Sequence, residues 1–247
     1  KTLFYPFQGA IRKHAGVDYK TFREQAMGSY KNTLRHPDSY RDQGDRDATR
    51  QDDFVYPINK NYVTNYFFPY AAGSDSLIYL KADHRHRPAF MIKDKDGEHR
   101  IRVRDISIDE QFSYRNGKIV YAAYESDPRW SWRDYSVIRI LDVRSGQQQS
   151  LTHKTKYFTP DISPDGKKVA AVQVSPGGRS AIHILDIGDG HVLDSVIQPA
   201  GLNLITDPKF IDNNMLLASV RHYDGRMSLA ITDLSIGKHL AMLTSPS

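Results

Sequence analysis

The spacing of hydrophobic residues has a helical period at the start of the chain. Between residues 18 and 36 the apolar positions recur every three or four residues, as on one face of a helix. These positions are Tyr19, Phe22, Ala26, Tyr30 and Leu34. Asp18 is placed to cap this helix, Gly16 to end a shorter helix before it, and Pro37 to stop it. We therefore predict a helical segment over residues 1–36.

The pattern then loses its apolar positions and returns with a different period. Residues 37–53 contain almost no aliphatic side chain and are densely charged, which predicts a linker over residues 37–60. From residue 61 onward, short β-branched and aromatic runs alternate with Gly, Asn, Asp and Pro. This alternation is typical of short strands separated by turns.

The predicted strands recur with a fixed period over residues 61–247. Four segments place a turn before an apolar strand: residues 74–83, 116–125, 165–174 and 213–222. A second strand follows each, and its Asp returns at separations of 48, 44 and 47 residues, as Asp94, Asp142, Asp186 and Asp233. A unit of about 45 residues with four short strands has the size of one β-propeller blade. A β-sandwich is the alternative, but the period favours a mainly β fold of four four-stranded blades.

One repeat carries a recognisable phrase. It reads PDISPDGKKVAAVQV over residues 160–174, and its Ser163–Gly166 portion suits a tight turn, since Pro fixes φ and Gly accepts φ > 0. The phrase resembles the TolB-like, or PD40/WD40-like, propeller repeat of bacterial periplasmic proteins, over roughly residues 65–245. Such propellers usually have six or more blades. Since only four blades are visible in this sequence, it represents either a partial propeller or, as the alternative, a closed ring of four blades.

The same resemblance carries an expectation about function. It implies a non-catalytic module that binds a protein, peptide or glycan partner in the periplasm or at the cell surface. TolB-like blades often follow a helical metallopeptidase-like domain, so residues 1–36 are expected to be the tail of an upstream domain. The alternative is a substrate-docking propeller of a larger hydrolase, metallopeptidase-like or prolyl-oligopeptidase-like, with its catalytic domain outside this chain.

The residues supply no catalytic or cofactor motif of their own. The sequence lacks H-E-x-x-H, G-x-S-x-G and the P-loop pattern, and it has no cysteine. The sequence contains no run of 18 apolar residues, the length that a membrane-spanning helix needs. We expect no catalytic residue, no metal and no cofactor in this chain.

The net charge of +5 is concentrated near the start. The first 50 residues hold 10 basic and 6 acidic side chains, whereas the remaining 197 hold 24 and 23. The blades are therefore almost neutral, which argues against nucleic acid as a partner. Docking of the basic helices on an acidic surface or membrane is a third hypothesis, although residues 18–34 lack a strongly basic face.

The strongest candidate for binding is the segment from Trp130 to Tyr135, which contains both tryptophans of the chain. Its predicted ligand-binding residues are Trp130, Trp132, Arg133 and Tyr135. Two tryptophans beside an arginine can form a platform for a sugar ring, a peptide or a proline-rich segment. In the alternative interpretation the rings fold back and cover the edge of the blade.

Other charged residues receive structural interpretations. His84 and His86 would share a strand face and could hold a metal, but Asp83 is expected on the opposite face, so a solvated hairpin tip is favoured. The recurring Asp residues are expected to form turns rather than bind Ca²⁺. Asp109, Glu110 and Asp161 stand isolated in the pattern. The alternation of Arg100, Arg102 and Arg104 predicts one polar strand face.

Overall fold

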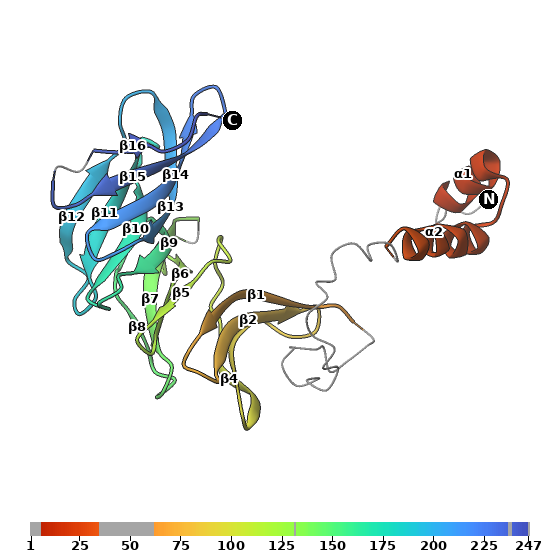
Figure 1. The fold of residues 1–247 in the computed structure, drawn as a ribbon, viewed down its shortest axis with the longest axis horizontal. Coiled ribbons are helices and arrows are strands. Elements are labelled where there is room, and N and C mark those ends of the chain that lie inside the picture. The colour runs from red at the N-terminus through yellow and green to blue at the C-terminus, as the bar shows by residue number, and fades with distance from the viewer. Residues whose placement is uncertain (1–5, 35–61, 131, 237–238, 247) are drawn as a thin grey trace, which may run out of the picture. The chain divides into compact units, whose positions relative to one another are not determined.

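The computed structural model describes residues 6–34, 62–130, 132–236 and 239–246 (Figure 1). These residues belong to two compact units, Lys1–Tyr56 and Pro57–Ser247, each with its own fold. The predicted linker over residues 37–60 and the predicted helix stop at Pro37 lie outside the described residues.

The first unit contains the two predicted helices, α1 (Pro6–Ala15) and α2 (Tyr19–Leu34). Asp18 caps α2, because its carboxylate accepts hydrogen bonds from the Thr21 N–H at 3.0 Å and the Thr21 hydroxyl at 3.1 Å. Gly16 takes a φ of +69° directly after α1, a conformation that glycine adopts without steric cost. Neither helix is long and apolar enough to span a membrane.

The described part of the second unit forms four antiparallel sheets of four strands each, in which neighbours in sequence are neighbours in the sheet. We call them blades 1 to 4. Blades 1 and 2 consist of β1 (Thr64–Ala71), β2 (Leu77–Asp83), β3 (Ala89–Asp94), β4 (Gly97–Val103), β5 (Ser113–Arg115), β6 (Lys118–Ser126), β7 (Asp134–Asp142) and β8 (Gln148–Ser150). Blades 3 and 4 consist of β9 (Tyr157–Ile162), β10 (Lys168–Val174), β11 (Ser180–Asp186), β12 (Val192–Ile197), β13 (Leu202–Phe210), β14 (Met215–His222), β15 (Met227–Asp233) and β16 (Ala241–Met242). The prediction of a mainly β fold with four four-stranded blades is confirmed.

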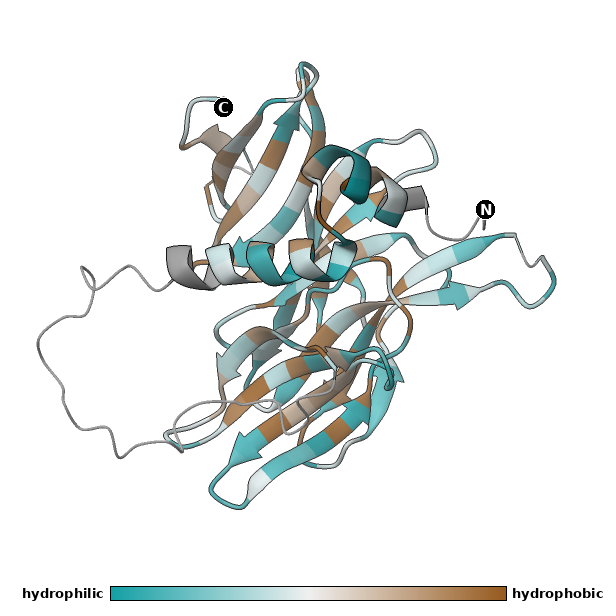
Figure 2. Ribbon diagram, turned by 90° about the vertical axis from the view of Figure 1, so that its right-hand side faces the viewer, coloured by the Kyte–Doolittle hydropathy of each residue, from teal (hydrophilic) through white to brown (hydrophobic). Residues whose placement is uncertain are grey.

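The core lies between consecutive blades, and blades 2 and 3 contribute to it from both faces. On β6, Ile119 and Tyr121 pack toward blade 1, whereas Val120 and Ala122 pack toward blade 3. Successive side chains of a strand point to opposite faces, so two adjacent interfaces need an apolar residue at every position. Figure 2 shows the apolar bands along the strands.

The turns follow the expected chemistry. Gly166 takes a φ of +71°, and its N–H donates to the Ser163 carbonyl at 2.9 Å, which closes the predicted tight turn. Each recurring Asp accepts a nearby backbone N–H at 2.7 to 2.9 Å: those of Asp96, Ser145, Gly188 and Ser235 donate to Asp94, Asp142, Asp186 and Asp233. The expectation that these carboxylates form turns is confirmed.

Polar side chains on β5 and β9, the first strands of blades 2 and 3, link each of these strands to the following blade. The Ser113 hydroxyl accepts the Ile162 N–H at 3.2 Å, and the Asp161 carboxylate accepts the Phe210 N–H at 2.9 Å. Each bond joins residues 49 positions apart, so the link recurs with the repeat. The expectation that Asp161 stands isolated is wrong, because a pattern read along one strand does not show the backbone donor of the following blade.

Two further expectations fail where the chain crosses from blade 1 to blade 2. Arg104 is only 6% exposed, and its guanidinium donates to the carbonyls of Asp109 at 2.6 Å and Gln111 at 3.2 Å. Arg104 therefore does not belong to an exposed polar strand face. Asp109 is not isolated either, since it accepts the Thr159 N–H at 2.9 Å and lies 3.4 Å from Arg104. Burial raises the pKa of Asp109.

Candidate functional site

The β6–β7 connection of blade 2, Asp127–Arg133, is a closed turn built around one carboxylate. Asp127 accepts the N–H groups of Arg129 at 2.9 Å and Trp130 at 3.2 Å, and the hydroxyl of Tyr135 at 3.1 Å. The Arg129 bond is the largest cause that holds the pKa of Asp127 below its usual value, and the charge of Lys154 adds to it. The backbone N–H of Arg133 closes the turn on the Trp130 carbonyl at 2.8 Å.

The turn presents its aromatic side chains outward. Trp130 is 49% exposed and Trp132 is 82% exposed, which is unusual for the side chain with the largest apolar surface. Cations lie against the rings: the Arg129 guanidinium is 5.6 Å from the centre of the Trp130 ring, and that of Arg133 is 5.9 Å from Tyr135. The alternative in which the tryptophans fold back to cover the blade edge does not describe Trp132.

Two hollows adjoin at this turn. One, of about 560 Å³, lies under the turn, and a second, of about 670 Å³, extends from it onto blade 3. Both are lined by Arg133, Tyr135 and Lys154, so we treat them as one site and call it the insert pocket. Its other lining residues are Asp127, Pro128, Arg129, Trp130, Asp134, Thr155, Lys156, Tyr157, Phe158, Gln173, Val174, Ser175, Pro176 and His183.

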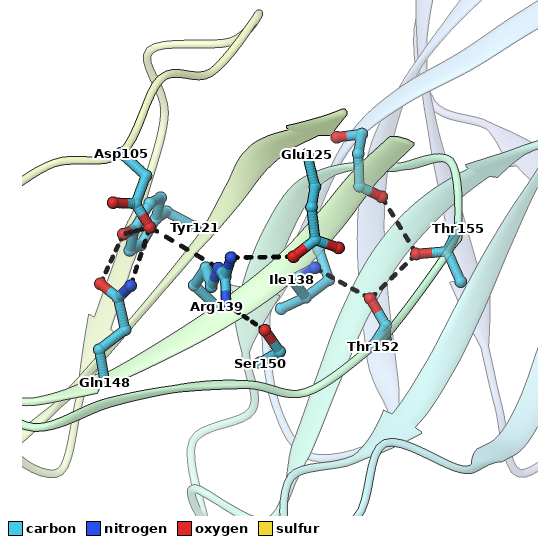
Figure 3. Close-up of polar contacts among 10 residues, drawn as sticks. Asp105, Tyr121, Glu125, Ile138, Arg139, Gln148, Ser150, Thr152 and Thr155 are labelled. Atoms are coloured by element: carbon cyan, nitrogen blue, oxygen red, sulfur yellow. Dashed lines mark hydrogen bonds and ion pairs between the residues drawn. The ribbon is translucent and has the colours of Figure 1, made fainter. Parts of the chain in front are cut away.

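The segment that joins β8 to β9 brings Lys154 into the pocket, and two threonines hold this segment in place. Thr152 accepts the Ile138 N–H at 2.9 Å and lies 3.0 Å from the Thr155 hydroxyl, which donates to the Ser136 carbonyl at 3.1 Å (Figure 3). Lys154 itself has a φ of +53°, a conformation that a non-glycine residue keeps only when its surroundings impose it. The pocket wall is therefore preorganised on this side.

The blade 3 side of the pocket is aromatic and neutral. The Tyr157 hydroxyl lies 2.8 Å from Nδ1 of His183, and the two rings meet edge to face with centres 5.6 Å apart. Burial lowers the pKa of His183 and raises the pKa of Tyr157. At neutral pH this pair is therefore uncharged, beside a rim that carries Arg129, Arg133, Lys154 and Lys156.

The structure brings together most of the predicted binding residues and adds others. Trp130, Arg133 and Tyr135 line the insert pocket, whereas Trp132 lies on the same turn without lining either hollow. The sequence pattern did not single out five other lining residues: Lys154, Lys156, Tyr157, Phe158 and His183. The basic and aromatic run KTKYF at residues 154–158 is the signal that would have pointed to four of these five.

A second polar cluster lies between blades 1 and 2 and is internally paired. Arg139 on β7 lies 3.2 Å from Glu125 and 3.6 Å from Asp105, and Gln148 donates to Asp105 at 2.8 Å (Figure 3). Arg139 also contacts Ser150. Since its charges already have partners, this cluster fixes the segment after β4 onto blade 2.

The histidine run of blade 1 is a solvated hairpin tip. Asp83 accepts the N–H groups of Arg85 and His86, both at 2.7 Å, and lies 3.0 Å from the His86 ring. The expectation that Asp83 points to the opposite face is wrong, because residues 84–88 form a turn and not a strand. In the described part of the chain, one group has metal-ligand proximity, Asp186, Asp189 and His191, and it forms an exposed turn with internal hydrogen bonds.

Comparison with known proteins identifies the fold. No protein-family model and no curated protein matches the chain. Among solved structures, TolB from Acinetobacter baumannii is similar at 22% identity and a TM-score of 0.55, over 72% of this chain and 42% of that one. A putative TolB from Agrobacterium tumefaciens follows at 13% identity and 0.52, over 69% and 61%. A prolyl endopeptidase has 14% identity and 0.51, over 74% of this chain and 30% of that one.

These similarities confirm a TolB-like propeller arrangement at the level of the fold. The chain spans 42% of the first TolB and 61% of the second, which is consistent with a partial propeller.

Proposed function

We propose that this chain is a non-catalytic propeller module that binds a protein partner, through a peptide segment, at the insert pocket. The observation that carries the proposal is the convergence of three elements on one hollow: the β6–β7 connection, the segment before β9 and the β10–β11 hairpin. Aromatic side chains with large exposed area beside arginine are typical of binding hot spots. The similarity to TolB supports a location in the periplasm or at the cell surface.

The domain organisation is part of the same proposal. Residues 1–36 are the tail of a separate helical domain, residues 37–60 are a linker, and residues 61–247 are the propeller blades. In this organisation the binding function belongs to the blades, and the basic helices only connect them to another domain.

A selection of peptides from a random phage-displayed library tests the binding function. The expected result is peptides that bind the wild-type chain and lose binding to the double variant Trp130→Ala/Trp132→Ala. The matched control is Tyr223→Ala, because Tyr223 is also an exposed aromatic residue, at 73%, in the equivalent connection of blade 4. Selected peptides that bind the double variant as tightly as the wild type would contradict the proposal. If no peptide is selected but the wild-type chain binds a glycan on an array and the double variant does not, the ligand is a glycan and not a peptide.

A second candidate function is substrate docking for a larger hydrolase. The observation in its favour is the similarity to the propeller-containing prolyl endopeptidase, of which this chain matches only 30%. Sequencing the gene on both sides of this segment distinguishes the two functions. A hydrolase domain in the same open reading frame favours docking, and its absence rules docking out.

A further inference from the structure

The basic side chains of the insert pocket form no close ion pairs with the described carboxylates. No ion pair within 4.0 Å joins Arg129, Arg133, Lys154 or Lys156 to a carboxylate among the described residues. Arg139 of the same blade is paired with both Asp105 and Glu125, whereas the four pocket cations line the insert pocket without such partners. The pocket therefore concentrates positive charge that the fold itself does not neutralise.

The two carboxylates near these cations are already engaged elsewhere. Asp127 holds the turn through Arg129 N–H, Trp130 N–H and Tyr135, and Asp134 accepts the Ser126 hydroxyl at 3.3 Å. Four cations and two carboxylates leave a positive excess at the rim of a chain whose blades are otherwise almost neutral. Such an excess attracts a ligand of opposite charge and selects against a basic one.

The inner part of the pocket has a different chemistry, which limits the kind of anion that fits. The half-buried Phe158 and Val174 line it together with the uncharged pair of Tyr157 and His183. A small inorganic anion would leave this apolar surface uncovered. A hollow of about 670 Å³ instead has the size of a site for several side chains.

We infer that the partner segment is an acidic peptide, in which carboxylates meet the basic rim and apolar side chains cover the inner wall. This inference rests on the proposed peptide-binding function and specifies its ligand. Each rim cation is exposed, so it contributes modestly on its own, and the preference comes from their sum.

Three fluorescein-labelled decapeptides test the inference. They share leucine at alternate positions and carry aspartate, asparagine or lysine at the others, and their binding is followed by anisotropy. The aspartate peptide should bind about tenfold more tightly than the asparagine peptide, the lysine peptide should bind weakest, and added salt should reduce the difference. Equal affinity of the aspartate and asparagine peptides, or no binding of the aspartate peptide, would overturn the inference.

Charge-removing variants locate the effect in the pocket. Arg133→Gln and Lys154→Gln should each weaken binding of the aspartate peptide about threefold and that of the asparagine peptide by a smaller factor. The matched control is Arg144→Gln, because Arg144 is an exposed arginine of the β7–β8 turn, outside the pocket lining. A loss in Arg144→Gln as large as that in the pocket variants would overturn the inference.

The double tryptophan variant separates this inference from the function on which it rests. Suppose that the three peptides bind the wild-type chain equally well and that Trp130→Ala/Trp132→Ala abolishes the binding of all three. The preference for acidic peptides is then wrong, and the binding function stands. If the aspartate peptide binds that variant at full strength, the proposed function itself fails.

Discussion

The β6–β7 connection of blade 2 and the β2–β3 connection of blade 1 begin with the same turn. Asp83 accepts the N–H groups two and three residues later, those of Arg85 and His86. Asp127 does the same with Arg129 and Trp130. Blades 1 and 2 thus share this backbone turn, and their two connections differ in the side chains that the turn carries.

The difference in side chains separates a closed tip from a pocket. In blade 1 the His86 ring turns back onto Asp83, at 3.0 Å. In blade 2 the Tyr135 hydroxyl occupies the second carboxylate oxygen of Asp127, and Trp130 remains 49% exposed. The comparison teaches that the repeat supplies the scaffold, whereas one irregular connection and the neighbouring segment supply the candidate site.

Weakening the scaffold should have the largest effect on stability and none on specificity. Asp161→Ala removes the acceptor of the buried Phe210 N–H and the partner of Lys209, at 3.3 Å. We expect a loss of about 2 kcal/mol in the free energy of unfolding, because a buried donor is left without an acceptor. Urea denaturation measures it. Peptide affinity of the folded protein should not change.

Asp224→Ala is the control for that loss, since Asp224 is exposed and bonds only to its own turn, through Arg226. It should leave the urea midpoint nearly unchanged. Equal midpoints for the two variants would show that the link between blades 3 and 4 does not stabilise the fold.

Replacement of the blade 2 connection by that of blade 1 tests whether the side chains of the connection make the binding site. A chimaera in which residues 84–88 replace residues 128–133 keeps an aspartate before the turn and removes Trp130, Trp132 and Arg133. We expect it to fold and to bind selected peptides at least about tenfold more weakly, because the aromatic hot spot is gone. Circular dichroism and anisotropy measure the two properties. A folded chimaera with wild-type affinity would place the binding site elsewhere.

Single substitutions of the turn-forming carboxylates compare the two connections without changing their length. Asp83→Ala and Asp127→Ala abolish the same pair of backbone hydrogen bonds, so both should lower the melting temperature by a similar small amount. Only Asp127→Ala should weaken peptide binding, by about threefold, since only that turn positions Trp130. If both variants bind like the wild type, the turn does not organise the site.

The smallest effect concerns pH. The pKa of His183 is lowered by burial, so between the folded value and the usual value of 6.5 the unfolded chain binds the proton more readily. Stability should therefore fall as the pH decreases through this window. His183→Gln should reduce the drop in melting temperature between pH 7.5 and 5.5 by an amount on the order of 1 °C. An unchanged or larger drop would contradict the burial of this imidazole in solution.

The sequence predicts those parts of the molecule that depend on local residues. The period of the recurring Asp gives the blades, the Ser163–Gly166 phrase gives a turn, and Asp18 gives a helix cap, because each acts on neighbours within a few positions. The sequence also singles out Trp130 to Tyr135, since no other repeat has comparable aromatic weight.

The remaining features depend on which blade faces which. The acceptor role of Asp161 needs the backbone of Phe210, which lies in the following blade. The contribution of Lys154 and His183 to the site becomes visible only when blade 3 packs beside blade 2. A pattern within one repeat contains no information on these contacts.

Intrinsic tryptophan fluorescence can test whether the insert pocket is the binding site. Trp130 and Trp132 are the two tryptophans of the chain, so its tryptophan emission reports on the β6–β7 connection alone. Titration with the tightest peptide recovered from the phage selection should shift this emission to shorter wavelength and saturate with the same Kd as anisotropy gives. Saturated binding by anisotropy with unchanged tryptophan emission would contradict the claim that the insert pocket is the binding site.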